Sequence, residues 1–210
     1  MHIAVAGNIG SGKTTLCEML SKHYNWQAEF ESVDNNPYLK DFYKDMSRWA
    51  FHLQIYFLNS RFNQVNKIKA SKKTIIQDRT IYEDAYIFAA NLHSSGHIND
   101  RDYSSYLNIF ESMVSFVEPP DLLIYLRADI PKLVQQIQKR GRDYEDAIQL
   151  EYLKNLNKHY ENWLGSYDKG QLLVIDVNNM DFVANSDDFS DIVSKIDVEL
   201  FGLFSKPIQQ

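Results

Sequence analysis

Short apolar runs alternate along the chain with longer stretches in which apolar residues recur at helical spacing. Four apolar runs predict strands at residues 2–6, 74–77, 122–126 and 172–175, and a weaker run at 28–31 predicts a fifth. The run at 122–126 has no polar interruption, which is typical of a parallel strand covered by helices on both faces. The pattern predicts an α/β fold with a five-stranded parallel sheet flanked by helices.

The stretches between these runs predict helices at residues 49–70 and 81–117. A third stretch carries apolar side chains at the spacing of a helix packed on the sheet; they are Leu150, Tyr152, Leu153, Leu156, Tyr160 and Trp163. Residues 178–188 are polar enough to form an exposed loop. No repeat, low-complexity tract or linker rich in proline and glycine divides the chain, so we expect residues 1–210 to form one domain.

Composition and charge indicate how the chain is stabilised and which binding partners are unlikely. A chain of 210 residues that is 44% hydrophobic can bury a core without disulfides or a structural metal. The net charge of −6 argues against the large basic surface with which proteins bind nucleic acid or an anionic membrane. The single cysteine, Cys17, lies in a predicted helix beside Leu16 and Leu20, where a packed thiol is expected. With no signal-like start and no apolar run of membrane-spanning length, a cytoplasmic protein without a membrane segment is expected.

The most specific motif follows the first predicted strand. The string is Gly7-Asn8-Ile9-Gly10-Ser11-Gly12-Lys13-Thr14, which matches G-x-x-x-x-G-K-[ST] in full between a strand and a helix. Its glycines let the loop curl so that backbone N–H groups face phosphates, and the next helix adds its positive N-terminal end. Lys13 is expected to contact the β- and γ-phosphates, and Thr14 to offer its hydroxyl to Mg²⁺. This P-loop, residues 7–14, predicts binding of ATP and Mg²⁺.

A P-loop alone does not name the acceptor. A regulatory GTPase would ordinarily carry an Asn-Lys-x-Asp motif and an Asp-x-x-Gly switch, and neither string occurs in the chain. That class is therefore excluded.

Further motifs follow the P-loop. They are Glu31-Ser32-Val33, Trp49-Ala50-Phe51-His52-Leu53-Gln54 with Arg61, Asp78-Arg79-Thr80 with Asp84, Gln138 to Glu145, and Ile175 to Phe182. With them the chain resembles the deoxyribonucleoside kinase family over nearly its whole length, and its deoxyadenosine, deoxyguanosine and deoxycytidine branch more than its thymidine-specific members. The resemblance implies a P-loop kinase fold with an arginine-bearing lid, ATP-dependent phosphorylation of a nucleoside 5′-hydroxyl in nucleotide salvage, and a homodimer.

The resemblance also assigns the chemistry. Glu31 matches the general base, and a carboxylate that accepts the proton of an attacking alcohol contributes about 10²- to 10⁴-fold in rate. Asp78 is expected to bind Mg²⁺, while Arg79 reaches the 5′ region and the transferred phosphoryl group. Asp78 and Thr80 replace a commoner glutamate and serine, both conservative changes.

The expected nucleoside pocket draws on the predicted helix at 49–70. Gln54 and Arg61 are seven residues apart, almost two helical turns, so they share one face and can point together into a pocket. In the family this pair reads the base. The neighbouring aromatic residues Phe51 and Phe57 are expected to help line the pocket. Asp84 matches an aspartate that pairs with the arginine at 61, which would disfavour thymidine.

The sugar and the phosphates are expected to be covered by a lid at about residues 138–146. Arg140 and Arg142 would close over the phosphates and exclude water, acting in both catalysis and ATP binding. Glu145 and Tyr43 match the residues that the family brings to the sugar 3′-hydroxyl. Gln136 replaces an arginine found in several relatives, so two lid arginines are expected. After the last strand, Asp181 and Phe182 match the loop that covers the adenine of ATP.

The sequence leaves two points about the phosphate acceptor open: which base the nucleoside carries, and whether the acceptor is a nucleoside at all. Several family members carry a tryptophan five residues after the base, where this chain has Asn36. An asparagine can add hydrogen bonds to a purine, which favours deoxyadenosine over deoxyguanosine or deoxycytidine. The rivals are a nucleoside monophosphate kinase of the thymidylate type, which would need basic residues around the acceptor's phosphate, and a noncatalytic ATP-binding regulator. Both are disfavoured, the second because Lys13, Glu31 and Arg79 are intact.

Overall fold

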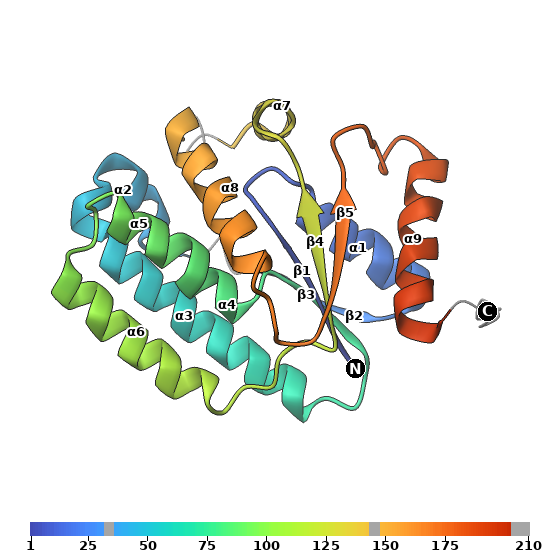
Figure 1. Ribbon diagram of the computed structural model, residues 1–210, viewed down its shortest axis with the longest axis horizontal. Coiled ribbons are helices and arrows are strands. Elements are labelled where there is room, and N and C mark those ends of the chain that lie inside the picture. The colour runs from blue at the N-terminus through green and yellow to red at the C-terminus, as the bar shows by residue number, and fades with distance from the viewer. Residues whose placement is uncertain (32–35, 143–147, 203–210) are drawn as a thin grey trace.

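A five-stranded parallel sheet forms the centre of the protein, as seen in a computed structural model that describes residues 1–31, 36–142 and 148–202 (Figure 1). The strands are β1 His2–Gly7, β2 Gln27–Glu29, β3 Ile75–Asp78, β4 Leu122–Arg127 and β5 Gln171–Asp176, in the order β2-β3-β1-β4-β5. The predicted α/β fold and parallel sheet are confirmed. The weak run at 28–31 forms a shorter strand that ends at Glu29, so Glu31 lies beyond the strand.

The register of the sheet brings the functional strand ends together. Val5 pairs with Asp78 across β1 and β3, and Gly7 pairs with Leu126 across β1 and β4. The carboxyl ends of these strands therefore meet at one edge, where β1 leads into the P-loop. Parallel sheets bind their ligands at this edge.

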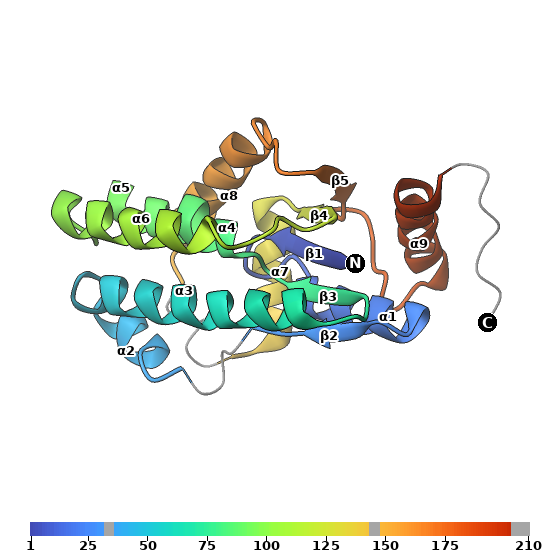
Figure 2. The ribbon, with the colours of Figure 1, turned by 90° about the horizontal axis from the view of Figure 1, so that it is seen from below.

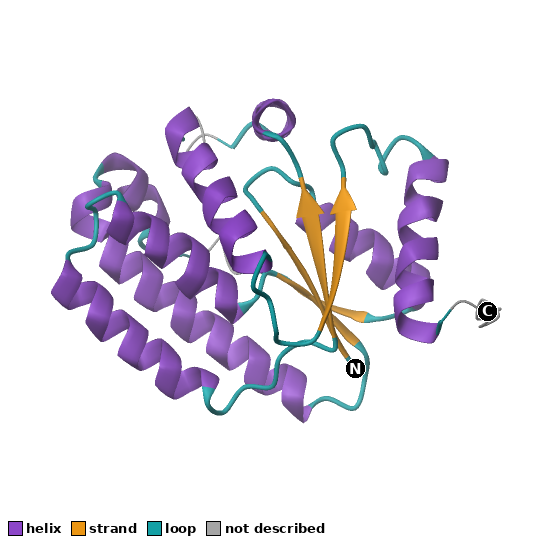
Figure 3. Cartoon of the chain, viewed as in Figure 1, coloured by secondary structure: helices purple, strands orange, loops and turns teal. Residues whose placement is uncertain are grey.

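Helices cover both faces of the sheet (Figure 3). They are α1 Lys13–Tyr24, α2 Leu39–Lys44, α3 Met46–Ala70, α4 Ile81–Glu83, the π-helical η1 Asp84–Ala89, α5 Ala90–Ser94, α6 Asp100–Val114, α7 Ile130–Arg140, α8 Leu150–Leu164 and α9 Ser186–Phe201. Helices α1 and α9 share one apolar cluster with β1 and β4, and α8 and η1 share another on the opposite face. Over the described ranges, no helix is both long enough and apolar enough to pass through a membrane.

The long helices α3 and α6 lie beside each other next to the sheet (Figure 2). Leu58 of α3 packs in one cluster with Tyr106 and Phe110 of α6. The helix predicted at 49–70 is therefore confirmed, and it begins three residues earlier, where the Asp45 carboxylate accepts the N–H of Arg48. This cap fixes the start of the helix that carries Gln54.

Two predicted boundaries are wrong. The single helix expected at 81–117 is interrupted after Ser94, since Gly96 turns the chain with a φ of 76° and Asn99 caps α6 by accepting the N–H of Asp102. The exposed loop expected at 178–188 is shorter, because α9 begins at Ser186. In both places a short polar cap begins a helix inside what the hydrophobic pattern presents as one element.

Two predicted core features are confirmed. Leu156 and Tyr160 of α8 are buried against Ala4 and Leu123 of the sheet. The Cys17 thiol is fully buried, and this burial raises its pKa well above the ordinary value. The thiol is thereby kept protonated and inert.

Candidate active site

A cavity of about 340 Å³ opens at the carboxyl edge of the sheet. Most of the site residues expected from sequence line it; they are Ile9, Gly10, Lys13, Thr14, Glu31, Tyr43, Gln54, Phe57, Asp78, Arg79, Asp84, Arg140 and Arg142. They come from separate parts of the chain, and the parallel register gathers them at one edge. The cavity therefore joins the expected phosphate-binding residues to the expected nucleoside-binding residues.

The P-loop forms the strand-to-helix turn expected from sequence. The Asn8 carbonyl oxygen accepts the backbone N–H of Ser11 at 3.2 Å and the Lys13 ammonium at 2.9 Å. Gly10 has a φ of 86°, and a Cβ there would lie 2.7 Å from the carbonyl oxygen of Leu133 in α7. Only glycine fits a left-handed backbone so close to another chain segment. The loop is thus packed directly against the helix that carries Arg140.

Lys13 lies buried at the floor of the cavity, with a side chain that is almost inaccessible to solvent. Burial, followed by repulsion from Arg79, lowers the pKa of Lys13 to about 8, although Asp78, Glu83 and Glu31 act in the opposite direction. A bound anionic phosphate would oppose both effects, because an opposite charge close to the lysine favours its protonated form. The buried, charged lysine therefore lowers the stability of the ligand-free protein, and a bound phosphate would relieve this destabilisation.

The lowered pKa of Lys13 predicts that the free energy of unfolding depends on pH. The Lys13 pKa of about 8 is below its ordinary value of 10.5, so the unfolded chain binds this proton more tightly than the folded one. The penalty is fully present below pH 8 and fades as the pH rises toward the ordinary value. We expect replacement of Lys13 by methionine to stabilise the ligand-free protein more at pH 7 than at pH 9.5, by roughly 2 kcal/mol. Urea denaturation of both proteins at both pH values measures this, and an equal stabilisation at the two pH values would contradict it.

Thr14 and Asp78 meet at the mouth of the P-loop. The Thr14 hydroxyl donates to Asp78 Oδ2 at 2.5 Å, while Asp78 Oδ1 is buried without a hydrogen-bond partner. An unsatisfied carboxylate oxygen beside a hydroxyl is the donor set that Mg²⁺ prefers. Across residues 1–31, 36–142 and 148–202, no cluster of three or more His, Cys, Asp or Glu side chains forms a metal site. A Mg²⁺ ion that keeps its waters and phosphate ligands needs no such cluster.

Glu31 is held by two arginines. Arg61 Nη2 donates to Glu31 Oε1 at 2.8 Å, and Arg79 Nε lies 3.2 Å from the same oxygen. Burial acts to raise the pKa of Glu31, but the positive charges of Arg79, Arg61 and Lys13 together outweigh it, so that the pKa is lowered. Glu31 is therefore an ionised carboxylate that lines the cavity and can accept a proton there.

Arg61 makes one of the contacts expected from the sequence, but it does not line the cavity. Its predicted pair with Asp84 is present, with 3.4 Å between Arg61 Nε and Asp84 Oδ2, and Arg61 Nη1 donates to the Asp78 carbonyl oxygen at 2.9 Å. Arg61 is not among the residues that line the cavity, so its contact with the base stays a prediction. Its guanidinium lies behind the wall and supports the carboxylates of Glu31 and Asp84. Helical spacing fixes a common face but not the depth at which a long side chain ends.

Three of the cavity residues are suited to bind a nucleobase. Gln54 is 3% exposed, and its Oε1 has no hydrogen-bond partner. A buried unsatisfied acceptor costs about 1–3 kcal/mol, which a ligand with a matching donor would recover. Asp84 also lines the cavity, where burial raises its pKa to about 7, and Phe57 adds an apolar ring. Asn36 is not among the residues that line the cavity; its Oδ1 accepts the backbone N–H of Tyr38, while its Nδ2 is buried without a hydrogen-bond partner.

Arg79 carries the one left-handed backbone among the described residues of the cavity wall that are not glycine, with a φ of 72°. Such a conformation costs about 1–3 kcal/mol, persists only where the surrounding structure holds it, and is concentrated at active sites and ligand-binding sites. The guanidinium lies 4.4 Å from the centre of the Phe88 ring, and Arg79 Nη1 donates to the Tyr160 hydroxyl at 3.0 Å. These contacts and Glu31 hold the arginine beside the P-loop.

Sequence reasoning missed several residues of this region. Phe88 and Tyr152 line the cavity, and Glu83 and Tyr160 contact Arg79 from behind. The spacing of Thr80 and Glu83 is a capping-box signal that marks the start of α4 and could have located Glu83. Phe88 and Tyr160 have no comparable signal, because both occupy positions that hydrophobic periodicity assigns to the core.

The described part of the predicted lid, residues 138–142, closes one side of the cavity. Arg140 is the last residue of α7, Gly141 has a φ of 64°, and both Arg140 and Arg142 line the cavity. Glu145 and the rest of the predicted lid after Arg142 lie outside the described residues. Both arginines line the same cavity as Lys13, and their contact with phosphates and the movement of a lid stay predictions.

The expected adenine loop follows β5, and neither of its named residues is among those that line the cavity. Phe182 is largely buried and packs under the P-loop against Gly12. Asp181 is exposed and accepts the N–H of Ala184 in the turn before α9, a hydrogen bond that lowers its pKa. Contact of Asp181 and Phe182 with adenine therefore stays a prediction.

Comparison with known proteins gives one family. A family model described as "Deoxynucleoside kinase" matches residues 3–201. A Bacillus subtilis protein named deoxyadenosine/deoxycytidine kinase is 38% identical over 92% of this chain and 90% of its own length. A Dictyostelium discoideum deoxyadenosine kinase is 44% identical over 87% of this chain and 74% of its own. A solved structure of deoxyadenosine kinase from M. mycoides, with dCMP and dCDP bound, has a TM-score of 0.84 at 32% identity and covers 94% of this chain and 99% of its own.

Proposed function

The chain belongs to the deoxynucleoside kinase family, and on that premise we propose that it transfers the γ-phosphate of ATP to the 5′-hydroxyl of deoxyadenosine. One observation carries the proposal. An ionised Glu31 carboxylate faces the same cavity as Lys13 and Arg79, so a proton acceptor lies beside phosphate-binding cations. Deoxycytidine and deoxyguanosine are the alternative acceptors.

In the proposed reaction, different residues of the cavity bind ATP, accept the proton and stabilise the transferred phosphoryl group. The P-loop and Lys13 bind the phosphates of ATP, and Glu31 accepts the proton of the 5′-hydroxyl while the hydroxyl oxygen attacks the γ-phosphorus. The bond from the γ-phosphorus to the β,γ-bridging oxygen breaks, and ADP leaves. Arg79, Arg140 and Arg142 place positive charge beside the group in transfer, where charge shifts toward the leaving oxygen. Tyr43 lines the cavity and is proposed to bind the sugar, together with Glu145.

Thr14 and Asp78 are the residues that would hold Mg²⁺. The orphaned Asp78 Oδ1 supports this assignment. When bound, Mg²⁺ neutralises charge on the phosphate oxygens.

Base selection is proposed to depend on Gln54 and Asp84. Adenine and cytosine both place an amino donor next to a ring-nitrogen acceptor, and a glutamine amide can pair with both groups at once. The unpartnered Gln54 Oε1 would accept the amino hydrogen, and the Asp84 carboxylate is a second acceptor nearby. This pairing suits adenine and cytosine alike, so the preference for deoxyadenosine over deoxycytidine rests on the names of the relatives. Asn36 is not among the residues that line the cavity and does not support it.

The direct test is an assay of the purified protein with Mg²⁺-ATP. Deoxyadenosine, deoxycytidine, deoxyguanosine and thymidine are compared, with their monophosphates in parallel. We expect turnover of nucleosides, deoxyadenosine first and thymidine least. Turnover of monophosphates alone would favour the thymidylate-kinase type of enzyme, and no turnover would favour a noncatalytic regulator.

Replacing Gln54 with leucine separates base recognition from stability. We expect kcat/KM for the preferred nucleoside to fall roughly 10- to 100-fold, because the apolar side chain leaves the base without its partner. The midpoint of thermal unfolding should stay equal or rise, since the substitution removes a buried unsatisfied acceptor. An unchanged kcat/KM would contradict the role of Gln54. Replacing Asn63 with leucine is the control, because Asn63 is exposed on the same helix and does not line the cavity.

Assembly and location are also proposals. A homodimer follows from the family resemblance, and sedimentation velocity would test it. A cytoplasmic location stays a prediction from the sequence.

A further inference from the structure

We infer that Glu83 and Tyr160 are positioning residues that hold Arg79 and the start of the P-loop in place for phosphoryl transfer, although neither lines the cavity. The inference rests on the proposed kinase function, and it concerns two side chains with no direct access to substrate.

Glu83 is a fully buried carboxylate that joins two active-site segments. Its Oε2 accepts the backbone N–H of Thr80 at 2.7 Å and the Thr80 hydroxyl at 3.2 Å. Its Oε1 lies 3.3 Å from the backbone nitrogen of Gly7, which donates to it, and 3.5 Å from Arg79 Nη1. One side chain thus links the turn after β3 to the first residue of the P-loop.

Tyr160 of α8 completes this link. Its hydroxyl lies 2.7 Å from Glu83 Oε1 and 2.8 Å from the Gly7 carbonyl oxygen, and its single proton serves one of them at a time. The same hydroxyl accepts Arg79 Nη1–H at 3.0 Å. The helix that packs on the sheet therefore contacts both the P-loop and the arginine through one oxygen.

The strained backbone of Arg79 explains why such support is needed. A left-handed conformation at a residue with a side chain persists only where its surroundings hold it. The Arg79 N–H donates to the Val5 carbonyl oxygen at 2.9 Å, Glu83 fixes the next residue, Thr80, and Tyr160 fixes the guanidinium. Together they direct the guanidinium toward Glu31 and the phosphate-binding loop.

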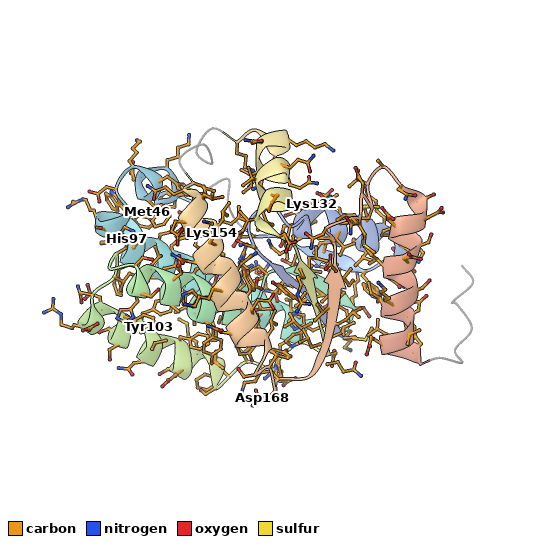
Figure 4. All side chains as sticks on the ribbon, turned by 45° about the horizontal axis from the view of Figure 1, so that its top comes forward. Met46, His97, Tyr103, Lys132, Lys154 and Asp168 are labelled. Atoms are coloured by element: carbon orange, nitrogen blue, oxygen red, sulfur yellow. The ribbon has the colours of Figure 1, made fainter. Side chains whose placement is uncertain are left out.

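A second contact shows that α8 supports the P-loop at more than one point. The Asn8 amide donates to the Leu153 carbonyl oxygen at 3.0 Å and to Asn157 Oδ1 at 2.5 Å. Figure 4 shows α8 running past the sheet from the turn that carries Lys154 toward the loop at Asp168. Tyr160 therefore belongs to a helix already fixed against the loop, so it can hold Arg79 rigidly.

The alternative is that this network serves only the stability of the fold, as a buried capping box would. The variant Tyr160→Phe keeps the ring and removes the hydroxyl. Tyr125→Phe is the matched control, because Tyr125 stacks on Tyr160 at 5.5 Å between ring centres but bonds Glu161, away from Arg79. We expect Tyr160→Phe to lower kcat roughly 10- to 100-fold with both KM values within about threefold, and Tyr125→Phe to keep the wild-type kcat. Glu83→Gln should resemble Tyr160→Phe.

A double-mutant comparison shows whether Tyr160 acts through Arg79. In an Arg79→Lys background, the added loss from Tyr160→Phe should shrink to less than about threefold. A multiplicative loss, an unchanged kcat in Tyr160→Phe, or an equal loss in Tyr125→Phe would overturn the inference. So would failure of both Tyr160→Phe and Glu83→Gln to fold, which would assign the network to stability. If the wild-type chain phosphorylates no nucleoside, the proposed function fails first, and this inference fails with it.

Discussion

Replacing Glu31 with glutamine is expected to lower kcat by about 10²- to 10⁴-fold while ATP binding is kept. Glutamine has nearly the same shape and can still accept a hydrogen bond from Arg61, but it cannot take the proton of the 5′-hydroxyl. Glu31 lines the cavity, and the hydrogen bond between Lys13 and Asn8 in the P-loop does not include it. The measurement is kcat with saturating nucleoside and ATP, together with ATP affinity by calorimetry.

The control for this change is Glu29→Gln, two residues earlier. Glu29 ends β2 and bonds Gln27, and it does not line the cavity. It should keep the wild-type kcat. If Glu31→Gln kept more than about a third of the wild-type kcat, Glu31 would not be the base. If it lost ATP binding as well, the main role of its charge would be to hold Arg61 and Arg79 in place.

The fold could be predicted where one physical signal dominates. The uninterrupted apolar run at 122–126 gave a buried central strand, and the glycine-rich string after the first run gave the P-loop. Prediction failed where a local feature interrupts a long pattern. The turn at Gly96 and the cap at Asn99 divide what reads as one helix, and the π-helical turn that carries Asp84 and Phe88 has no signature in hydrophobic periodicity.

Site residues could be predicted from the sequence where a charged side chain follows a predicted strand closely. Lys13, Glu31 and Asp78 were all expected in the cavity and line it. The residues behind the wall were mostly missed, since burial depth depends on how elements pack. Arg61 was expected to face the pocket, and Tyr160 was expected only to fill the core, whereas both make polar contacts with the catalytic region.

The second large effect is expected from Arg79→Lys, which should lower kcat by about 10²- to 10³-fold although the positive charge remains. The guanidinium of Arg79 reaches Glu31 on one side and the Tyr160 hydroxyl on the other while it lies on the Phe88 ring. A lysine ammonium is a compact point charge that cannot span these partners from one position. The variant would keep a positive charge near the transferred phosphoryl group, but its N–H donors would no longer be held in a fixed orientation.

The matched control is Arg127→Lys, since Arg127 is half-exposed and pairs with Glu161 of the same helix that carries Tyr160. Exposed pairs contribute at most about 1 kcal/mol, so this variant should keep its activity and nearly all its stability. Full activity in Arg79→Lys would mean that positive charge alone is sufficient and that the left-handed backbone at Arg79 has another cause. A large loss of kcat with unchanged ATP affinity would instead mean that the direction of the guanidinium matters. That direction is what the strained turn, the buried carboxylate of Glu83 and the Tyr160 hydroxyl together determine.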